Sequence, residues 1–215
     1  MPRTTRKPPP PTLVLFVRHG QTPTTGDRLP GRARGLHLSD EGRAQAEAVG
    51  ARIAALTKVD AVYASPLERT RETAACIGRA RNVKVAIERG LLECDFGDWT
   101  GGELKALRKA PEWRTVQRYP SGFRFPNGES FTEMQARMLS TVERLRGAHP
   151  GGTVVAVSHA DPIKAATAAA LGTHLDLFQR IVISPCSVTA IAYADDGPVV
   201  LAVNSVGDLK ALKPS

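Results

Sequence analysis

Apolar positions along the chain fall into short runs that alternate with longer segments of helical spacing. Each run is rich in apolar residues and is bounded by turn-forming residues, which is typical of buried strands. The sequence ADDGP joins the last two runs and indicates a hairpin turn. The predicted strands lie at about 12–17, 61–64, 83–87, 153–158, 188–194 and 198–204.

Between these runs, apolar residues recur at the spacing of amphipathic helices. Ser39 is a candidate N-cap for the first helix, and Pro66 would stand in the first turn of the second. The predicted helices lie over 43–56, over 66–80, within 128–152, and from Asp161 to about Gly172.

Strands alternating with helices predict an α/β fold, a three-layer sandwich in which helices flank a mostly parallel sheet. Residues 95–130 are rich in Gly, Pro, Trp and Arg and do not follow the alternation, so we predict a small inserted lid there. Residues 1–11, MPRTTRKPPPP, are predicted to be a disordered, basic, Pro-rich tail. The remaining residues, 12–215, would form a single domain.

Composition limits the possible partners. The net charge of +8 favours acidic partners, but part of it lies in the tail, and no basic block with interleaved aromatic residues is present, so we expect no nucleic-acid binding. The first apolar run is too short for a membrane span. Three widely spaced cysteines without a CxxC pair indicate free thiols in a reducing compartment, and we predict a cytoplasmic protein. The sequence is compatible with a homodimer and does not determine the oligomeric state.

Reactive residues follow three of the predicted strands. FVRHG ends the first strand with Arg18 and His19, SPLERTRETA follows the second and carries Arg69, and VVAVSHADP ends the fourth with His159. In α/β folds, ligands bind beyond the carboxyl ends of parallel strands. Arginine matches phosphate oxygens with a planar fork of donors, so these residues predict a pocket for a phosphoryl group.

A carboxylic acid completes this chemistry. Neutral imidazole is a good nucleophile toward phosphorus, and the departing alkoxide then needs a proton. In LLECDFGDWTG, Glu93 follows an apolar pair and is preferred as the acid over Asp95 and Asp98. Such an acid works best when partial burial or nearby negative charge raises its pKa toward neutrality.

The motifs RHGQT, SPLERTRETA, LLECDFGDWTG, PNGES and SHADPI, in this order, resemble the histidine phosphatase superfamily, which has the phosphoglycerate mutase-like fold. The resemblance covers about residues 12–205, and TGDRLPGRARGLHLSDEG is similar to an actinobacterial subgroup labelled as phosphomutases. It implies that His19 is the phosphorylated nucleophile and Glu93 the proton donor. The implied partners in the phosphate pocket are Arg18, Arg69 and His159, with substrate-binding positions at Gln21, Thr22, Thr25 and Ala160.

The sequence departs from the family pattern near the nucleophile. Thr25 replaces the usual asparagine and has a shorter reach than an amide. Arg32 and Arg34 are candidates for reading a second acidic group on the substrate, and Asp161 adds a carboxylate near the pocket.

The resemblance implies a phosphomonoester hydrolase that acts through phosphohistidine on a small phosphorylated metabolite. The segment between Glu93 and His159 is shorter than the corresponding segment of mutases in the family. This short segment favours water as the acceptor of the phosphoryl group. A phosphomutase and a catalytically silent phosphate-ester-binding module are the alternatives. No HExxH or CxxC spacing indicates a metal site, and we expect neither a metal nor another cofactor.

Overall fold

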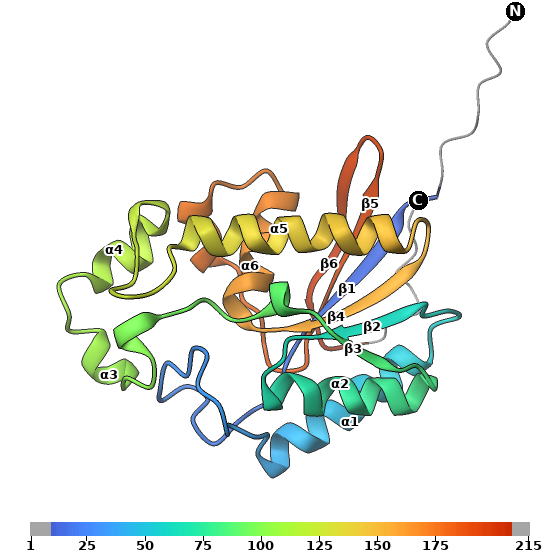
Figure 1. Cartoon of the computed structure of the whole chain (residues 1–215), viewed down its shortest axis with the longest axis horizontal. Helices are drawn as coiled ribbons and strands as arrows, with labels where there is room; N and C mark the ends of the chain where they lie inside the picture. The colour runs from blue at the N-terminus through green and yellow to red at the C-terminus, as the bar shows by residue number, and fades with distance from the viewer. Residues whose placement is uncertain (1–9, 208–215) are drawn as a thin grey trace, which may run out of the picture.

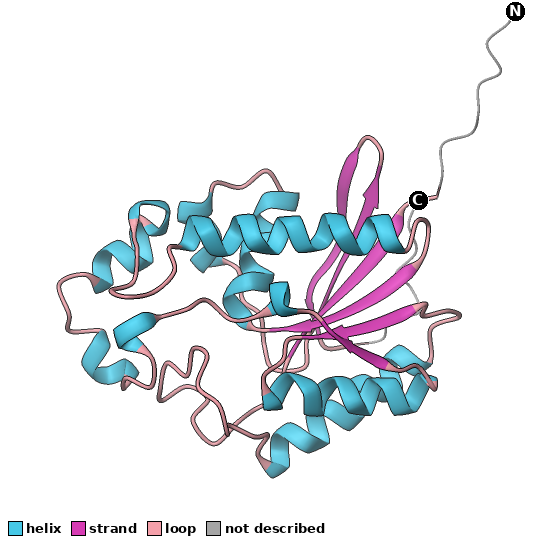
Figure 2. Cartoon of the chain, in the orientation of Figure 1, coloured by secondary structure: helices cyan, strands magenta, loops and turns pink. Residues whose placement is uncertain are grey.

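A computed structural model describes residues 10–207 and shows one six-stranded sheet between two layers of helices (Figures 1 and 2). The strand order is β3-β2-β4-β1-β5-β6. The strands are β1 (Thr12–Arg18), β2 (Ala61–Ala64), β3 (Val85–Ile87), β4 (Thr153–Ser158), β5 (Val188–Ala194) and β6 (Gly197–Ser205).

Strands β1 to β4 run parallel to one another. Strand β5 pairs antiparallel with β1, and β6 pairs antiparallel with β5 in a hairpin. The central strand β1 is buried on both faces, which explains why LVLFV is a continuous apolar run rather than an alternating one. Arg18 pairs with Ser158 in the register, so the carboxyl ends of β1 and β4 lie side by side.

Two helices cover each face of the sheet, as Figure 1 shows. Successive β1 residues point to opposite faces of the sheet. Leu15 and Phe16, for example, belong to separate apolar clusters. The first face is covered by α1 (Asp40–Ala54) and α2 (Glu68–Arg81), and the second by α5 (Phe131–Ala148) and α6 (Ala160–Ala170).

The caps show why the helices begin where they do. Ser39 accepts a hydrogen bond from the backbone of Gly42, and Ser130 forms a reciprocal capping box with Glu133. The prediction for Pro66 is wrong, because α2 begins at Glu68, with Leu67 as its N-cap residue. The mostly parallel α/β sandwich predicted from the sequence is confirmed.

Residues 95–130 contain only short helical segments, and their aromatic side chains pack together with those of α5 and residues 175–180. Phe96, Phe125, Phe131 and Phe178 are all buried in this cluster. The short elements of the chain are η1 (Arg89–Leu91), η2 (Gly97–Trp99), α3 (Leu104–Leu107), α4 (Trp113–Arg118), η3 (Pro120–Gly122) and η4 (Leu175–Arg180).

The lid and the single-domain organisation stay predictions. Residues 1–9 of the predicted tail lie outside the described residues. Among residues 10–207, no helix is both long and apolar enough to cross a membrane.

Candidate active site

The structure brings the three reactive strand ends together. The backbone N–H of His19 donates to the carbonyl of Ser158 over 3.0 Å, and that of Ser65 donates to Val157 over 3.0 Å. The imidazole rings of His19 and His159 lie edge to face, with their centroids 5.2 Å apart. Both histidines therefore lie together at the carboxyl edge of the sheet.

His19 is fixed in one orientation. Its Nδ1 lies 2.7 Å from the carbonyl oxygen of Gly20, and because a carbonyl can only accept, Nδ1 carries the proton. The lone pair is therefore on Nε2. Burial, together with the positive charges of Arg69 and Arg18, lowers the pKa of His19 well below its usual value, so the ring is neutral.

Two guanidinium groups lie close to the histidines, that of Arg69, which is fully buried, and that of Arg18, which is half-buried. Arg18 donates to the carbonyl of Ile183 over 2.7 Å, and Arg69 donates to the carbonyl of Gly31 over the same distance. The Nε of each arginine is buried and has no hydrogen-bond partner. Buried charged donors without partners are costly, so this pocket suits an anion.

His159 is the N-cap residue of α6 and is fully buried. Its Nε2 lies 2.9 Å from the Ser65 hydroxyl, whereas its Nδ1 has no partner. Burial and the neighbouring cations lower the pKa of His159 well below its usual value. The N-terminus of an eleven-residue helix adds positive potential at this point, where Ala160 lines the cavity.

Glu93 supplies a buried carboxyl group to the same cavity. Burial and the negative charge of Asp161 raise its pKa to about 7, against the opposing influence of Arg69 and Arg18. One oxygen accepts the Cys94 backbone N–H over 3.0 Å. A carboxyl group that keeps its proton near neutral pH can act as a general acid.

Asp95 and Asp98, the two alternatives to Glu93 as the acid, form polar contacts with other side chains. Asp95 forms an ion pair with Arg32, and Asp98 accepts from the side-chain amide of Asn127. Of these three acids, Glu93 is the one that lines the cavity.

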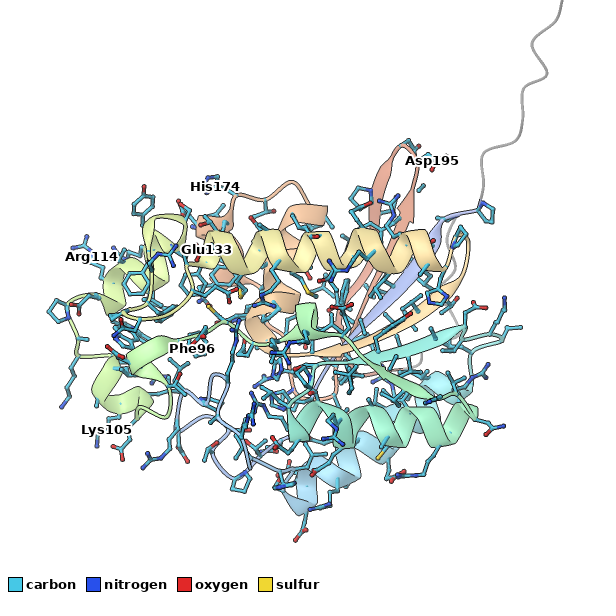
Figure 3. All side chains as sticks on the ribbon, in the orientation of Figure 1. Phe96, Lys105, Arg114, Glu133, His174 and Asp195 are labelled. Carbon is cyan, nitrogen blue, oxygen red and sulfur yellow. The ribbon has the colours of Figure 1, made fainter. Side chains whose placement is uncertain are left out.

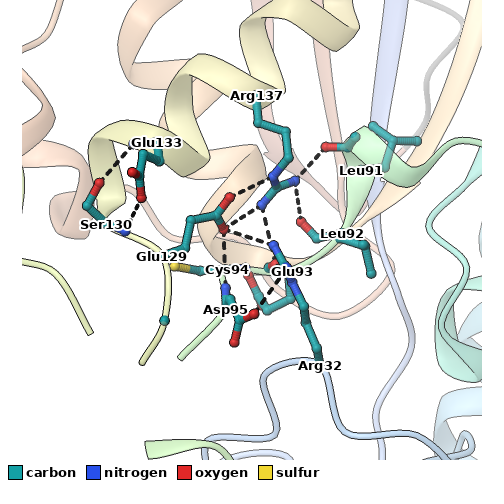
Figure 4. A network of polar contacts seen from close by, with 12 residues as sticks. Arg32, Leu91, Leu92, Glu93, Cys94, Asp95, Glu129, Ser130, Glu133 and Arg137 are labelled. Atoms are coloured by element: carbon teal, nitrogen blue, oxygen red, sulfur yellow. Dashed lines mark hydrogen bonds and ion pairs between the residues drawn. The ribbon is translucent and has the colours of Figure 1, made fainter. Parts of the chain in front are cut away.

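A polar network, which we call the Glu93 clamp, holds the backbone around this acid (Figure 4). It consists of Arg32, Asp95, Glu129 and Arg137. Arg32 and Arg137 both donate to the carbonyl oxygen of Glu93, over 2.9 and 3.3 Å. Both arginines also form ion pairs with Glu129, which lies between them.

The clamp corrects the expectation for Arg32. Its guanidinium group is satisfied by Asp95, Glu129 and a backbone carbonyl, so it is not free to read a second acidic group of a substrate. Arg34 is exposed and does not line the active-site cavity. Arg137 was missed by the sequence analysis, because it acts through backbone carbonyls and no local motif marks it.

The loop after His19 forms one wall of a cavity of about 390 Å³, the active-site cavity. Thr22 and Thr25 line it, and Thr25 accepts the backbone N–H of Thr22 over 2.8 Å. The position of Gln21 differs from the expectation. Gln21 is not part of the cavity wall, and its backbone and side chain hydrogen-bond Gln45 of α1.

Arg18, His19, Glu93 and Ala160 line the cavity, and the fully buried Arg69 and His159 do not line it themselves. Within residues 10–207, no group of three or more His, Cys, Asp or Glu side chains is placed to hold a metal ion.

This pair of neutral histidines among arginines, beside a carboxyl group of raised pKa, is suited to binding a phosphoryl group at the edge of a mostly parallel sheet. Residues 14–206 match the family model of the histidine phosphatase superfamily (branch 1), and the chain belongs to that superfamily.

Named relatives match most of the chain. Phosphoserine phosphatase 1 of Hydrogenobacter thermophilus is 32% identical over 196 residues, covering 89% of this chain and 91% of its own. A bifunctional protein of Mycobacterium tuberculosis is 32% identical over 201 residues, or 93% of this chain; the chain spans only 55% of that relative. The solved structure of a mycobacterial glucosyl-3-phosphoglycerate phosphatase superposes with a TM-score of 0.81 at 26% identity, over 90% of this chain and 98% of the other.

Proposed function

We propose that this protein is a phosphomonoester hydrolase that forms a phosphohistidine at His19. The observation that carries the proposal is the fixed, neutral state of His19, whose Nδ1–H is held by Gly20 while Nε2 keeps its lone pair. A superfamily in which relatives are named phosphatases supports the same chemistry.

In the first step, Nε2 of His19 attacks the phosphorus atom, and the bond between phosphorus and the ester oxygen breaks. Arg18, Arg69 and the donors of His159 and the α6 N-terminus stabilise the charge on the non-bridging oxygens. The carboxyl group of Glu93 gives its proton to the departing alkoxide, so the product leaves as a neutral alcohol.

In the second step, the Glu93 carboxylate accepts a proton from water. The resulting hydroxide attacks the phosphohistidine, the P–N bond breaks, and inorganic phosphate is released. Nε2 recovers its lone pair and Glu93 is again protonated, so the cycle closes without any other group.

Water is the proposed acceptor, with a small phosphorylated metabolite as substrate. The proposed steps use side chains alone and need no metal ion. Three free, buried cysteines suit a reducing compartment, which supports a cytoplasmic location.

Single-turnover labelling tests this proposal. We expect wild-type protein to take up labelled phosphate from a phosphomonoester as an acid-labile, base-stable adduct, and to release one inorganic phosphate for each alcohol, with the phosphate following the alcohol. His19→Ala should form no adduct and lose at least about 10³-fold in kcat. Full activity of His19→Ala would contradict the proposal, and transfer of label to a second alcohol instead of water would indicate a mutase.

A further inference from the structure

A second cavity adjoins the active-site cavity and is lined by no residue of the phosphoryl pocket, which comprises Arg18, His19, Arg69, Glu93 and His159. It has a volume of about 150 Å³ and shares four wall residues with its neighbour: Leu29, Phe96, Asp161 and Gln179. Most of its remaining wall is aromatic or aliphatic, including Trp99, Trp113 and Val116. We call it the aromatic chamber.

The two tryptophans of the aromatic chamber keep exposed surface next to the site. The Trp99 and Trp113 rings are nearly parallel, at 12°, with centroids 6.4 Å apart. Both are half-buried, whereas Phe96 and Phe125 behind them are buried. Covering such faces with an apolar or ring-shaped group is favourable, and an aromatic contact adds to the energy of burial.

The charges around the two cavities are already paired outside the phosphoryl pocket. Three cations of the described chain line the cavities. Arg28 pairs with Glu103 over 3.1 Å, and Lys164 pairs with Asp161 over 3.2 Å and donates to Gln179. The third, Arg18, belongs to the phosphoryl pocket.

No other Lys or Arg of the described residues lines either cavity. In Figure 3, Lys105 and Arg114 extend outward from the end of the molecule that carries α3 and α4. Arg32 is held in the Glu93 clamp. A substrate with a second phosphate or a carboxylate would therefore have to break an existing ion pair to be neutralised.

We propose that the aromatic chamber binds the alcohol part of the substrate, and that this alcohol is uncharged and carries a single ring. The proposal rests on the phosphatase function proposed above. An apolar cavity of about 150 Å³ is large enough for one six-membered ring, since such a cavity can hold benzene. Asp161 and Gln179, at the shared wall, can accept hydrogen bonds from hydroxyl groups on that ring.

The first test compares three synthetic phosphomonoesters. Benzyl phosphate carries an uncharged ring, 4-carboxybenzyl phosphate carries the same ring with a second anion, and ethyl phosphate has no ring. We expect kcat/KM for benzyl phosphate to exceed that of each of the others by about tenfold or more, which corresponds to ~1.4 kcal/mol.

The second test uses variants of α4. Trp113→Ala should lower kcat/KM for benzyl phosphate about tenfold and leave ethyl phosphate within about twofold, while Trp113→Phe, which keeps a flat ring, retains most of the preference. Gln117→Trp adds bulk at the exposed edge of the chamber without removing packing, and should lower benzyl phosphate hydrolysis selectively. Tyr119→Ala is the control, since Tyr119 is 57% exposed and lines neither cavity.

These outcomes separate the two proposals. Equal kcat/KM for benzyl and ethyl phosphate, or a preference for the carboxylated ester, overturns the assignment of the aromatic chamber while the His19-dependent hydrolysis stands. Equal losses on both esters in Gln117→Trp, with a normal melting temperature, overturn it as well. Hydrolysis that survives in His19→Ala would instead reject the phosphatase mechanism itself.

Discussion

The carboxyl group of Glu93 lies between two opposing influences. Burial and Asp161 favour its neutral form, whereas Arg69 and Arg18 favour its charged form, and the result is a pKa of about 7. Protonated Glu93 can serve as an acid below that pH and becomes a carboxylate above it. Since the proposed first step consumes this proton, the rate of that step should follow the protonated fraction of Glu93.

For Glu93→Gln we expect a loss of about 10²–10⁴-fold in the rate of the first step, measured as alcohol release in a single turnover, with an alkyl phosphate, whose leaving group needs a proton. The loss should be much smaller with 4-nitrophenyl phosphate, whose leaving group is stable as an anion. In wild-type protein, the rate of alkyl phosphate cleavage should fall as pH rises above about 7, and this limb should be absent in the variant. Stopped-flow measurements from pH 5 to 9 with both esters check this, and equal losses on the two esters would exclude Glu93 as the acid.

At the scale of elements, helix α5 supports the site from outside the cavity. Arg137 donates hydrogen bonds to the carbonyls of Gly90, Leu92 and Glu93. One side chain of α5 therefore fixes the backbone of the segment that carries Glu93. Glu129, just before the helix, neutralises Arg137 and Arg32 together. The position of the acid therefore depends on three segments that are far apart in sequence.

We expect Arg137→Gln to reduce alkyl phosphate hydrolysis by about 10–100-fold, because it frees the backbone on both sides of Glu93. A positioning role predicts that 4-nitrophenyl phosphate is less affected and that the alkaline limb of the pH profile shifts. Arg144→Gln is the matched control, because Arg144 lies on the same helix, is largely exposed and pairs with Glu88. Similar effects of both substitutions on both esters, together with equal falls in melting temperature, would show that Arg137 has only a structural role.

Elements defined by periodic burial were predictable, and those defined by long-range contacts were not. The runs LVLFV and VVAV read directly as β1 and β4, because both faces of these strands are covered. The short helices α3 and α4 have too few turns to leave a periodic signal, and the aromatic cluster holds this region in place. The roles of Arg32 and Arg137 depend on carbonyl groups, which carry no sequence signal.

At the scale of the whole molecule, the start of helix α1 contacts the loop that follows His19, backbone against backbone. The carbonyl of Gln21 accepts the N–H of Ser39, the N-cap residue of α1. A Cβ atom at Gly42 would collide with the carbonyl oxygen of Gln21, and one at Gly20 would collide with that of Gly42. Glycine is required at both positions by this close approach, which joins α1 to the segment that carries His19.

Gly42→Ala should therefore destabilise the protein by about 1–3 kcal/mol and reduce kcat, since the helix must move away from the loop. Gly147→Ala in α5 is the control, because nothing lies within 4 Å of the added atom, and it should be neutral or slightly stabilising. Urea unfolding and steady-state rates of both variants check the prediction. A Gly42→Ala protein with wild-type stability would show that this contact is easily relieved.

The buried side-chain nitrogen atoms of Arg18, Arg69 and His159 that have no partner within the protein have a consequence for turnover. We expect an oxyanion bound in the pocket to accept hydrogen bonds from such groups, and the orthophosphate released at the end of each proposed cycle offers the same oxygen atoms as the ester. Accumulated orthophosphate should therefore slow the enzyme as a competitive product inhibitor. It should also raise the melting temperature with its concentration, because a ligand that binds only the folded state stabilises it.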